Sequence, residues 1–217
     1  TYCANNPLKF VDPTGMIVDP SELTKEQQKT FNAAMQNACS KSPLFAQMYD
    51  EMHSSDIVYK IKIGSTSGDL PGQYNPADNS ITFKNENFMV DFNTFFEEFF
   101  HGYQMGENKS LYEEGKEFNY EFEAKIMKTF MFYESVMPVG ITPGTEGFIN
   151  FLDNSYGTSE VPNSQDVRSE NFQTEYTKQA NSYANYNKAA GGFPSNYQTK
   201  TEQSPKSMLK LFNNTKR

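Results

Sequence analysis

Residues 95–104 read FFEEFFHGYQ, and the interpretation of this stretch decides how the rest of the chain is understood. The run Glu-Glu-Phe-Phe-His (97–101) differs at one position from His-Glu-x-x-His. In that pattern two imidazoles one helical turn apart hold zinc, and the glutamate between them activates water. Here Glu97 stands at the position of the first imidazole. The alternative interpretation is an amphipathic helix with a solvated acidic face.

Helical geometry groups the polar residues of this stretch. At 100° per residue, Glu97, Glu98 and His101 fall on one arc. Residues three and four apart are neighbours on a helix, so both glutamates are within reach of the imidazole. The opposite arc is aromatic: Phe92, Phe95, Phe96, Phe99, Phe100 and Tyr103. The pattern permits a metal site without requiring one.

A following helix carries two further carboxylates, in the run NYEFEAKIM (119–127). Glu121 lies twenty residues beyond His101, in the Glu-x-x-small pattern from which zinc peptidases often take a third ligand, although an ion pair with Lys125 would also explain it. Glu123 falls among apolar residues, where an unpaired carboxylate is unfavourable. Spacing favours Glu121 and burial favours Glu123, so both remain candidates, with a slight preference for Glu121.

Caps and apolar spacing predict an α+β fold. Helices are expected over about 25–39, 43–52, 91–105, 117–136 and 146–153, with weaker helical character over 165–188. Alternating residues predict a strand over 57–63, and 70–84 has the pattern of a hairpin. We therefore expect a small antiparallel sheet with the motif helix and several packed helices.

Composition argues against several classes of protein. The chain has 217 residues and a formal net charge of −8, which argues against a nucleic-acid binder because such proteins need a basic face. It contains no run of about 18 apolar residues, so no membrane span is expected. Two cysteines, Cys3 and Cys39, are too few to indicate a disulfide framework.

The first residues differ in character from the rest. Residues 2–16 read YCANNPLKFVDPTGM, an extended run between turn formers. This segment resembles the end of the Rhs/YD-repeat core, which closes on a pattern of the type N-N-P-L-x-x-x-D-P-x-G-Leu, with Met16 here in place of Leu. The resemblance implies that residues 1–16 end an Rhs carrier core, with cleavage after Met16. Residues 17–217 would then be the variable effector or toxin domain.

Within that domain, about residues 70–130 resemble the metallopeptidase-like toxin domains at the ends of Rhs proteins, in which a helix of the His-Glu-Leu-x-His-Ala-Tyr-Gln kind precedes a Glu-x-Glu-Ala helix. The resemblance implies a zincin-like fold with a metallopeptidase-like core over about 57–137. It implies that Glu98 is the general base, that His101 is a metal ligand, and that Glu121 or Glu123 is the third ligand.

The substitution at Glu97 changes the expected metal chemistry. A carboxylate oxygen can replace an imidazole nitrogen as ligand, but an oxygen-rich site holds zinc less tightly and suits harder ions such as manganese. His53, the other histidine, is a candidate for the second imidazole, although a histidine at a helix end is commonly a surface residue.

These observations lead to two functional hypotheses. The first is a secreted Rhs-type toxin, delivered outside the cell or into a target cell, that hydrolyses a protein substrate with a divalent metal ion, zinc being the first candidate. Its partners would be the Rhs core carrier and an immunity protein. The alternative is a catalytically inactive zincin-like domain that binds a target or immunity protein.

Overall fold

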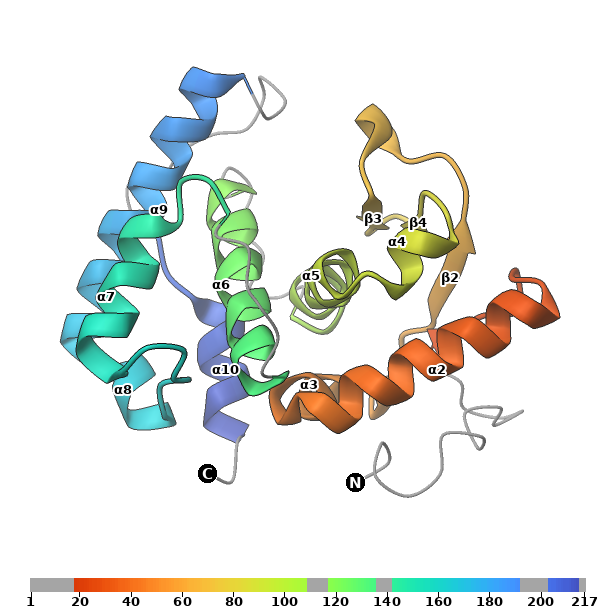
Figure 1. Ribbon diagram of the computed structural model, residues 1–217, viewed down its shortest axis with the longest axis horizontal. Coiled ribbons are helices and arrows are strands. Elements are labelled where there is room, and N and C mark those ends of the chain that lie inside the picture. Colours follow the sequence, from red (N-terminus) through yellow and green to blue (C-terminus); the bar gives the residue numbers. More distant parts are fainter. Residues whose placement is uncertain (1–17, 109–116, 136–141, 192–202, 215–217) are drawn as a thin grey trace. The chain divides into compact units, whose positions relative to one another are not determined.

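The computed structural model describes residues 18–108, 117–135, 142–191 and 203–214, and it divides the chain into two compact units, Thr1–Lys109 and Ser110–Arg217 (Figure 1). The segment that resembles an Rhs core and the cleavage position predicted after Met16 lie outside the described residues. Cys39 is disulfide-bonded, and Cys3, the other cysteine of the sequence, also lies outside them. No helix in the described part of the chain is long and apolar enough to cross a membrane.

The α+β class is confirmed, but the expectation of an antiparallel sheet is wrong. The first unit holds a mixed four-stranded sheet of order β1-β2-β4-β3, in which β1 and β4 run parallel to β2 and only the β3–β4 hairpin is antiparallel. The second strand of the hairpin, not the first, pairs with β2, and this order makes that pairing parallel. The strands are β1 (Val18–Asp19), β2 (Tyr59–Ile63), β3 (Gly72–Asn75) and β4 (Ser80–Phe83).

Local sequence signals explain the helices of the first unit. Thr24 and Gln27 form a capping box, and Ser42 caps the next helix with Pro43 at its first position. Asn85 and Asp91 cap the two helices that follow β4. The elements are α2 (Lys25–Lys41), α3 (Pro43–His53), the 3₁₀ turn η2 (Ser67–Asp69), α4 (Glu86–Val90), α5 (Phe92–Gly102) and the π-helical turn η3 (Tyr103–Glu107).

Aromatic side chains of α5 form the centre of the first unit. The ring of Phe95 lies 4.8 Å from that of Phe99, 5.7 Å from that of Phe45 on α3, and 6.0 Å from that of Phe83 on β4. Phe31 of α2 lies 6.0 Å from Phe95 in the same cluster. Ring spacings of this kind add to the free energy gained from burial, so the cluster fixes α5 against the sheet and its two neighbouring helices.

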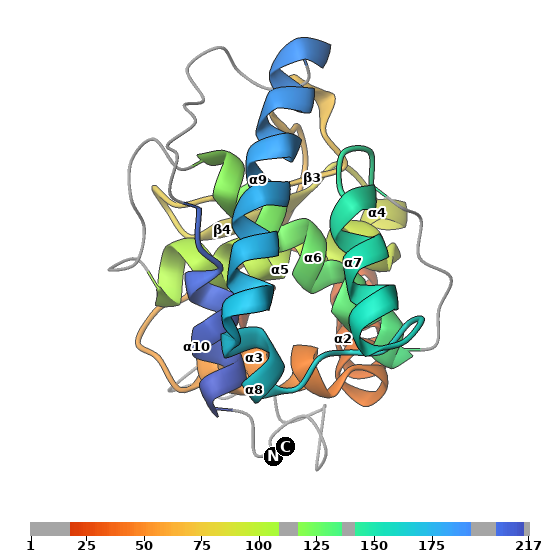
Figure 2. The same cartoon turned by 90° about the vertical axis from the view of Figure 1, so that its left-hand side faces the viewer.

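The second unit is helical, and its helices lie alongside one another in Figure 2. The weak helical pattern over 165–188 is in fact two helices, because Ser169 has extended backbone angles and caps the second one through Phe172 N. A last helix near the C-terminus was not anticipated. The helices are α6 (Glu117–Ser135), α7 (Glu146–Tyr156), α8 (Ser164–Arg168), α9 (Glu170–Ala190) and α10 (Lys206–Asn214).

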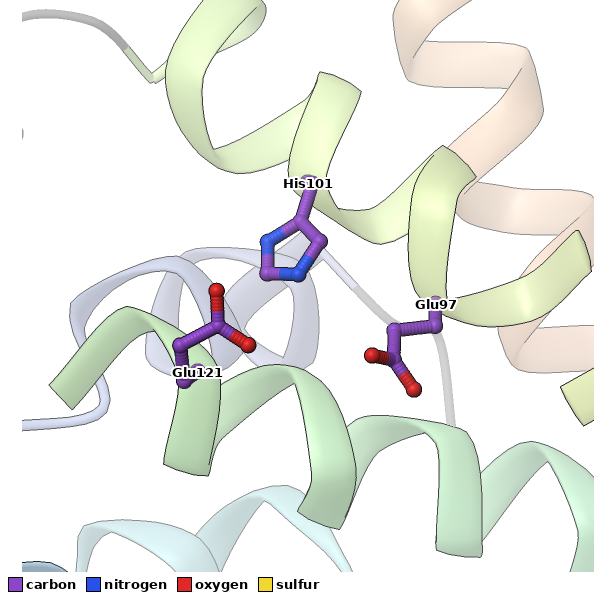
Figure 3. Close-up of side chains that lie close together, drawn as sticks. All are labelled: Glu97, His101 and Glu121. Carbon is purple, nitrogen blue, oxygen red and sulfur yellow. The ribbon is translucent and has the colours of Figure 1, made fainter. Parts of the chain in front are cut away.

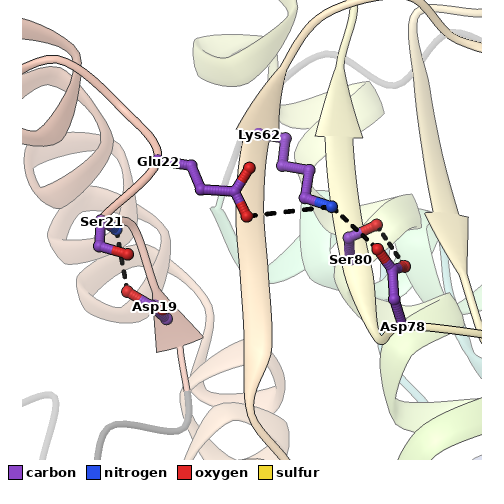
Figure 4. Close-up of polar contacts among 6 residues, drawn as sticks. All are labelled: Asp19, Ser21, Glu22, Lys62, Asp78 and Ser80. Atoms are coloured by element: carbon purple, nitrogen blue, oxygen red, sulfur yellow. Dashed lines mark hydrogen bonds and ion pairs between the residues drawn. The ribbon is translucent and has the colours of Figure 1, made fainter.

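A polar cluster ties the strands of the first unit together at the surface (Figure 4). Lys62 Nζ on β2 lies 2.9 Å from Asp78 Oδ2 and 4.0 Å from Glu22 Oε1, and Ser80 Oγ donates to Asp78 Oδ1 at 2.7 Å. The hydrogen bond from Lys62 lowers the pKa of Asp78 below its ordinary value, and Ser80 lowers it further. The same contact raises the pKa of Lys62.

We expect Asp78→Asn to lower the free energy of unfolding by less than about 1 kcal/mol near pH 7, because both partners are partly exposed and water screens the pair. The folded-state pKa of Asp78 lies below the unfolded one. Its contribution is therefore complete above the ordinary aspartate pKa and is lost as the pH falls through the lowered value. Urea denaturation at about pH 7 and about pH 3 measures the difference in free energy of unfolding between wild type and Asp78→Asn. Substitution of the exposed Asp56, Asp56→Asn, is the control. A wild-type advantage over Asp78→Asn that grows on acidification would contradict the assignment.

Candidate metal centre

The motif helix α5 is buried on its polar side as well as on its aromatic side. Glu98 is only 7% exposed and His101 only 6%, while Glu97 is half-buried. The alternative of a solvated acidic face is therefore wrong for Glu98 and His101. Because burying a polar side chain without a partner is unfavourable, both groups need partners inside the protein.

Glu98 lies against the first residue of strand β3. A Cβ atom built on Gly72 would come within 2.7 Å of Glu98 Cγ and 2.6 Å of Thr94 Cγ2, so no side chain fits between the strand and α5. The nearer carboxylate oxygen, Oε1 of Glu98, would be 3.1 Å from that Cβ. Since β3 is an edge strand of the sheet, this close approach holds the carboxylate of Glu98 beside a sheet edge.

His101 has a polar partner two positions beyond the end of α5. Its Nδ1 lies 2.9 Å from Oε1 of Gln104, and Gln104 is 1% exposed. The residue belongs to the π-helical turn η3, which continues α5 directly. Such turns are frequent at functional sites. The sequence resemblance includes Gln104 but assigns no role to it, and its three-residue spacing from His101 was the signal that could have found it.

One group of side chains among the described residues can hold a metal ion: Glu97, His101 and Glu121. One ligand atom from each lies within 4.8 Å of the others, and Figure 3 shows the three side chains close together. Carboxylate oxygens and imidazole nitrogens of proteins bind zinc at about 2.0–2.2 Å. Two carboxylates and one imidazole make a donor set that fits a divalent ion.

Glu123 does not belong to this group and has a different partner. It is fully buried, and its Oε1 accepts a 2.7 Å hydrogen bond from the backbone N of Met208, the third residue of α10. The first N–H groups of a helix have no partner within the helix, and a carboxylate there is favoured by the helix dipole. Burial and the nearby Glu123 raise the pKa of Tyr176. The N-terminus of α10 thus explains a buried carboxylate that the sequence left without a partner.

His53 is likewise absent from the group. It ends α3, is half-buried, and its ring lies 6.2 Å from that of Tyr49. The structure therefore brings together three of the sequence candidates, Glu97, His101 and Glu121, and leaves His53 and Glu123 outside. No family model, curated protein or solved structure matches the chain.

Gly72→Ala tests the packing of the edge strand on Glu98. We expect the added Cβ to push β3 away from α5 and to lower the free energy of unfolding by about 1–3 kcal/mol, as overpacking of a well-filled contact does. Urea denaturation of the full chain measures the loss. Gly64→Ala is the matched control, because a Cβ there meets nothing within 4 Å. Adding Thr94→Ser to Gly72→Ala should recover part of the loss, and equal destabilisation by both glycine substitutions would contradict the contact.

Proposed function

We propose that this chain is a metal-dependent peptidase domain with a zincin-like site, carried at the C-terminal end of an Rhs-type protein. The observation that carries the proposal is the group formed by Glu97, His101 and Glu121. The buried Glu98 lies on α5, the helix that also carries Glu97 and His101. This combination supplies metal ligands and a separate carboxylate, which is the division of labour that metal-assisted hydrolysis needs.

The donor set favours a hard divalent ion. Two carboxylate oxygens offset the charge of such an ion, and a single imidazole is the only nitrogen ligand. Oxygen-rich sites suit manganese and related ions better than all-nitrogen sites do, so manganese becomes a candidate beside zinc. When bound, the ion would supply Lewis-acid polarisation of a carbonyl and a more acidic water.

Glu98 is the residue that we assign to proton transfer. It is not a member of the ligand group, and the close approach of Gly72 restricts its side chain on one side. A carboxylate held in this way can take a proton from the attacking water and return it to the departing amine. Its burial excludes competing contact with bulk solvent.

The edge strand β3 suggests the form of the substrate. Among the described residues β3 pairs only with β4, so its other edge has no strand partner there. An extended peptide can bind a sheet edge through backbone hydrogen bonds. Because Glu98 lies against the first residue of β3, a peptide bound there would pass close to the carboxylate.

The resemblance of residues 2–16 to the end of an Rhs core supports the biological setting of the proposal. On that basis the domain is a secreted or delivered toxin, with the Rhs core as carrier and an immunity protein that protects the producing cell. Loss of one imidazole favours the alternative, an inactive domain that binds a target or immunity protein. Metal binding and Glu98 dependence distinguish the two.

We expect the wild-type chain, stripped with a chelator, to bind one Mn²⁺ or Zn²⁺ ion. Removing a ligand with Glu97→Gln, His101→Gln or Glu121→Gln should weaken binding at least tenfold, because each deletes one of three donors. Titration calorimetry and Mn²⁺ electron paramagnetic resonance measure the affinity. Glu123→Gln is the matched control, since it removes a charge two residues from Glu121 while keeping an acceptor for Met208 N. Equal loss in this control, or no binding by the wild type, would overturn the metal site.

Glu98→Gln tests the catalytic assignment separately. It should retain the metal affinity of the wild type but lose about 10²–10⁴-fold in peptide cleavage, because an amide cannot accept the proton. Cleavage is followed by mass spectrometry on a library of unstructured peptides, and toxicity is compared on expression in the target compartment. Equal toxicity of the variant and the wild type, with no cleavage by either, would favour the binding domain.

A further inference from the structure

The contact between His101 and Gln104 determines more than the position of the ring. A neutral imidazole has one N–H donor and one acceptor nitrogen, whereas an amide oxygen only accepts. Nδ1 of His101 faces Oε1 of Gln104 at 2.9 Å, so this contact is a hydrogen bond only when Nδ1 carries the proton. The lone pair of the neutral ring then lies on Nε2.

Several contacts hold the π-helical turn that carries Gln104. The backbone N and the side-chain Nδ2 of Asn108 both donate to the carbonyl oxygen of Tyr103, at 3.1 and 3.0 Å. The hydroxyl of Tyr103 donates to Glu51 Oε2 on α3 at 2.6 Å. Gly106 lies so close to the ring of Tyr59 on β2 that no Cβ fits there. The turn is thus fastened to both α3 and β2.

These contacts leave Gln104 little freedom to swing away from the ring. The side chain is 1% exposed and His101 is 6% exposed, so water does not compete strongly for either group. A buried hydrogen bond is difficult to exchange for another, because an unsatisfied partner is unfavourable. The geometry therefore keeps the side chain of Gln104 opposite Nδ1, with Oε1 at 2.9 Å.

We propose that Gln104 is a positioning residue that holds His101 in the Nδ1–H tautomer and so presents Nε2 as the metal-binding nitrogen. The tautomer is inferred from the contact between His101 and Gln104 and needs no metal. Its consequence for metal affinity rests on the proposed function. Histidine ligands in metal sites commonly donate their second N–H to an oxygen that fixes ring orientation. Here an uncharged amide oxygen supplies that acceptor.

The direct test is the tautomer of His101 in the metal-free full chain. Ring-¹⁵N-labelled histidine in a His53→Gln background leaves one imidazole to observe. Long-range ¹H–¹⁵N correlation near pH 8.5, well above the ordinary histidine pKa of about 6.5, distinguishes the two neutral forms. We expect His101 to be in the Nδ1–H form when residue 104 is the wild-type glutamine. Gln104→Leu should shift the population toward Nε2–H, the form that free histidine favours in water.

Two further variants separate positioning from folding. Gln104→Glu keeps an oxygen acceptor and should retain Nδ1–H, whereas Gln28→Leu removes a hydrogen-bonded amide on α2 and should leave His101 unchanged. Metal affinity should fall about 10–100-fold in Gln104→Leu. In Gln104→Glu it should stay within a few-fold of the wild-type affinity. Circular dichroism establishes that the variants are folded.

The outcomes are distinguishable. An Nε2–H ring in the wild-type sequence, or an unchanged tautomer in Gln104→Leu, overturns the assignment. A wild-type Nδ1–H ring that changes in Gln104→Leu supports it, even if no metal binds to any variant. In that case the proposed metal function fails while the role of Gln104 in setting the tautomer stands.

Discussion

Burial of the aromatic side of α5 is the constraint on which the rest of the site depends. Phe95 and Phe99 pack among rings from α2, α3 and β4, and this packing fixes both the position and the rotation of the helix. Since side-chain directions on a helix follow from its rotation, the directions of Glu97, Glu98 and His101 are set by the same packing. The aromatic core thus determines in which direction the polar side chains of α5 lie.

The helices could be predicted from the sequence because their signals are local. Thr24, Ser42 and the apolar spacing of α2 and α3 act within a few residues, so no knowledge of distant contacts was needed. Strand pairing is different. The alternation of residues 57–63 and the turn before β4 predict strands, but they do not say which strand of the hairpin lies beside β2. That order depends on contacts across the sheet, and it made the sheet mixed.

The candidate site residues also divide into those that local sequence places together and those that depend on distant contacts. Glu97 and His101 are one turn apart on one helix, so their proximity follows from the helical repeat alone. The choice between Glu121 and Glu123 could not be made from the helical repeat. Glu123 accepts a hydrogen bond from the N-terminus of α10, which begins eighty-three residues later. The sequence pattern had not indicated this helix. A buried carboxylate indicates a positive partner of some kind. For Glu123 one such partner is the backbone N–H of Met208 at the start of α10, so burial alone did not indicate a metal.

In the proposed site a carboxylate takes the place that an imidazole has in His-Glu-x-x-His, and this changes what each ligand would do. The carboxylates of Glu97 and Glu121 each offer two equivalent oxygens, so either can present a donor after a rotation of its terminal bond. An imidazole offers one lone pair, on whichever nitrogen lacks the proton. In a site with two imidazoles, an unfavourable tautomer at one leaves a second nitrogen ligand in place. Among the described residues of the proposed site His101 is the only nitrogen donor, so the tautomer of this ring would decide whether the site has a nitrogen ligand, and the Gln104 contact bears on the whole donor set.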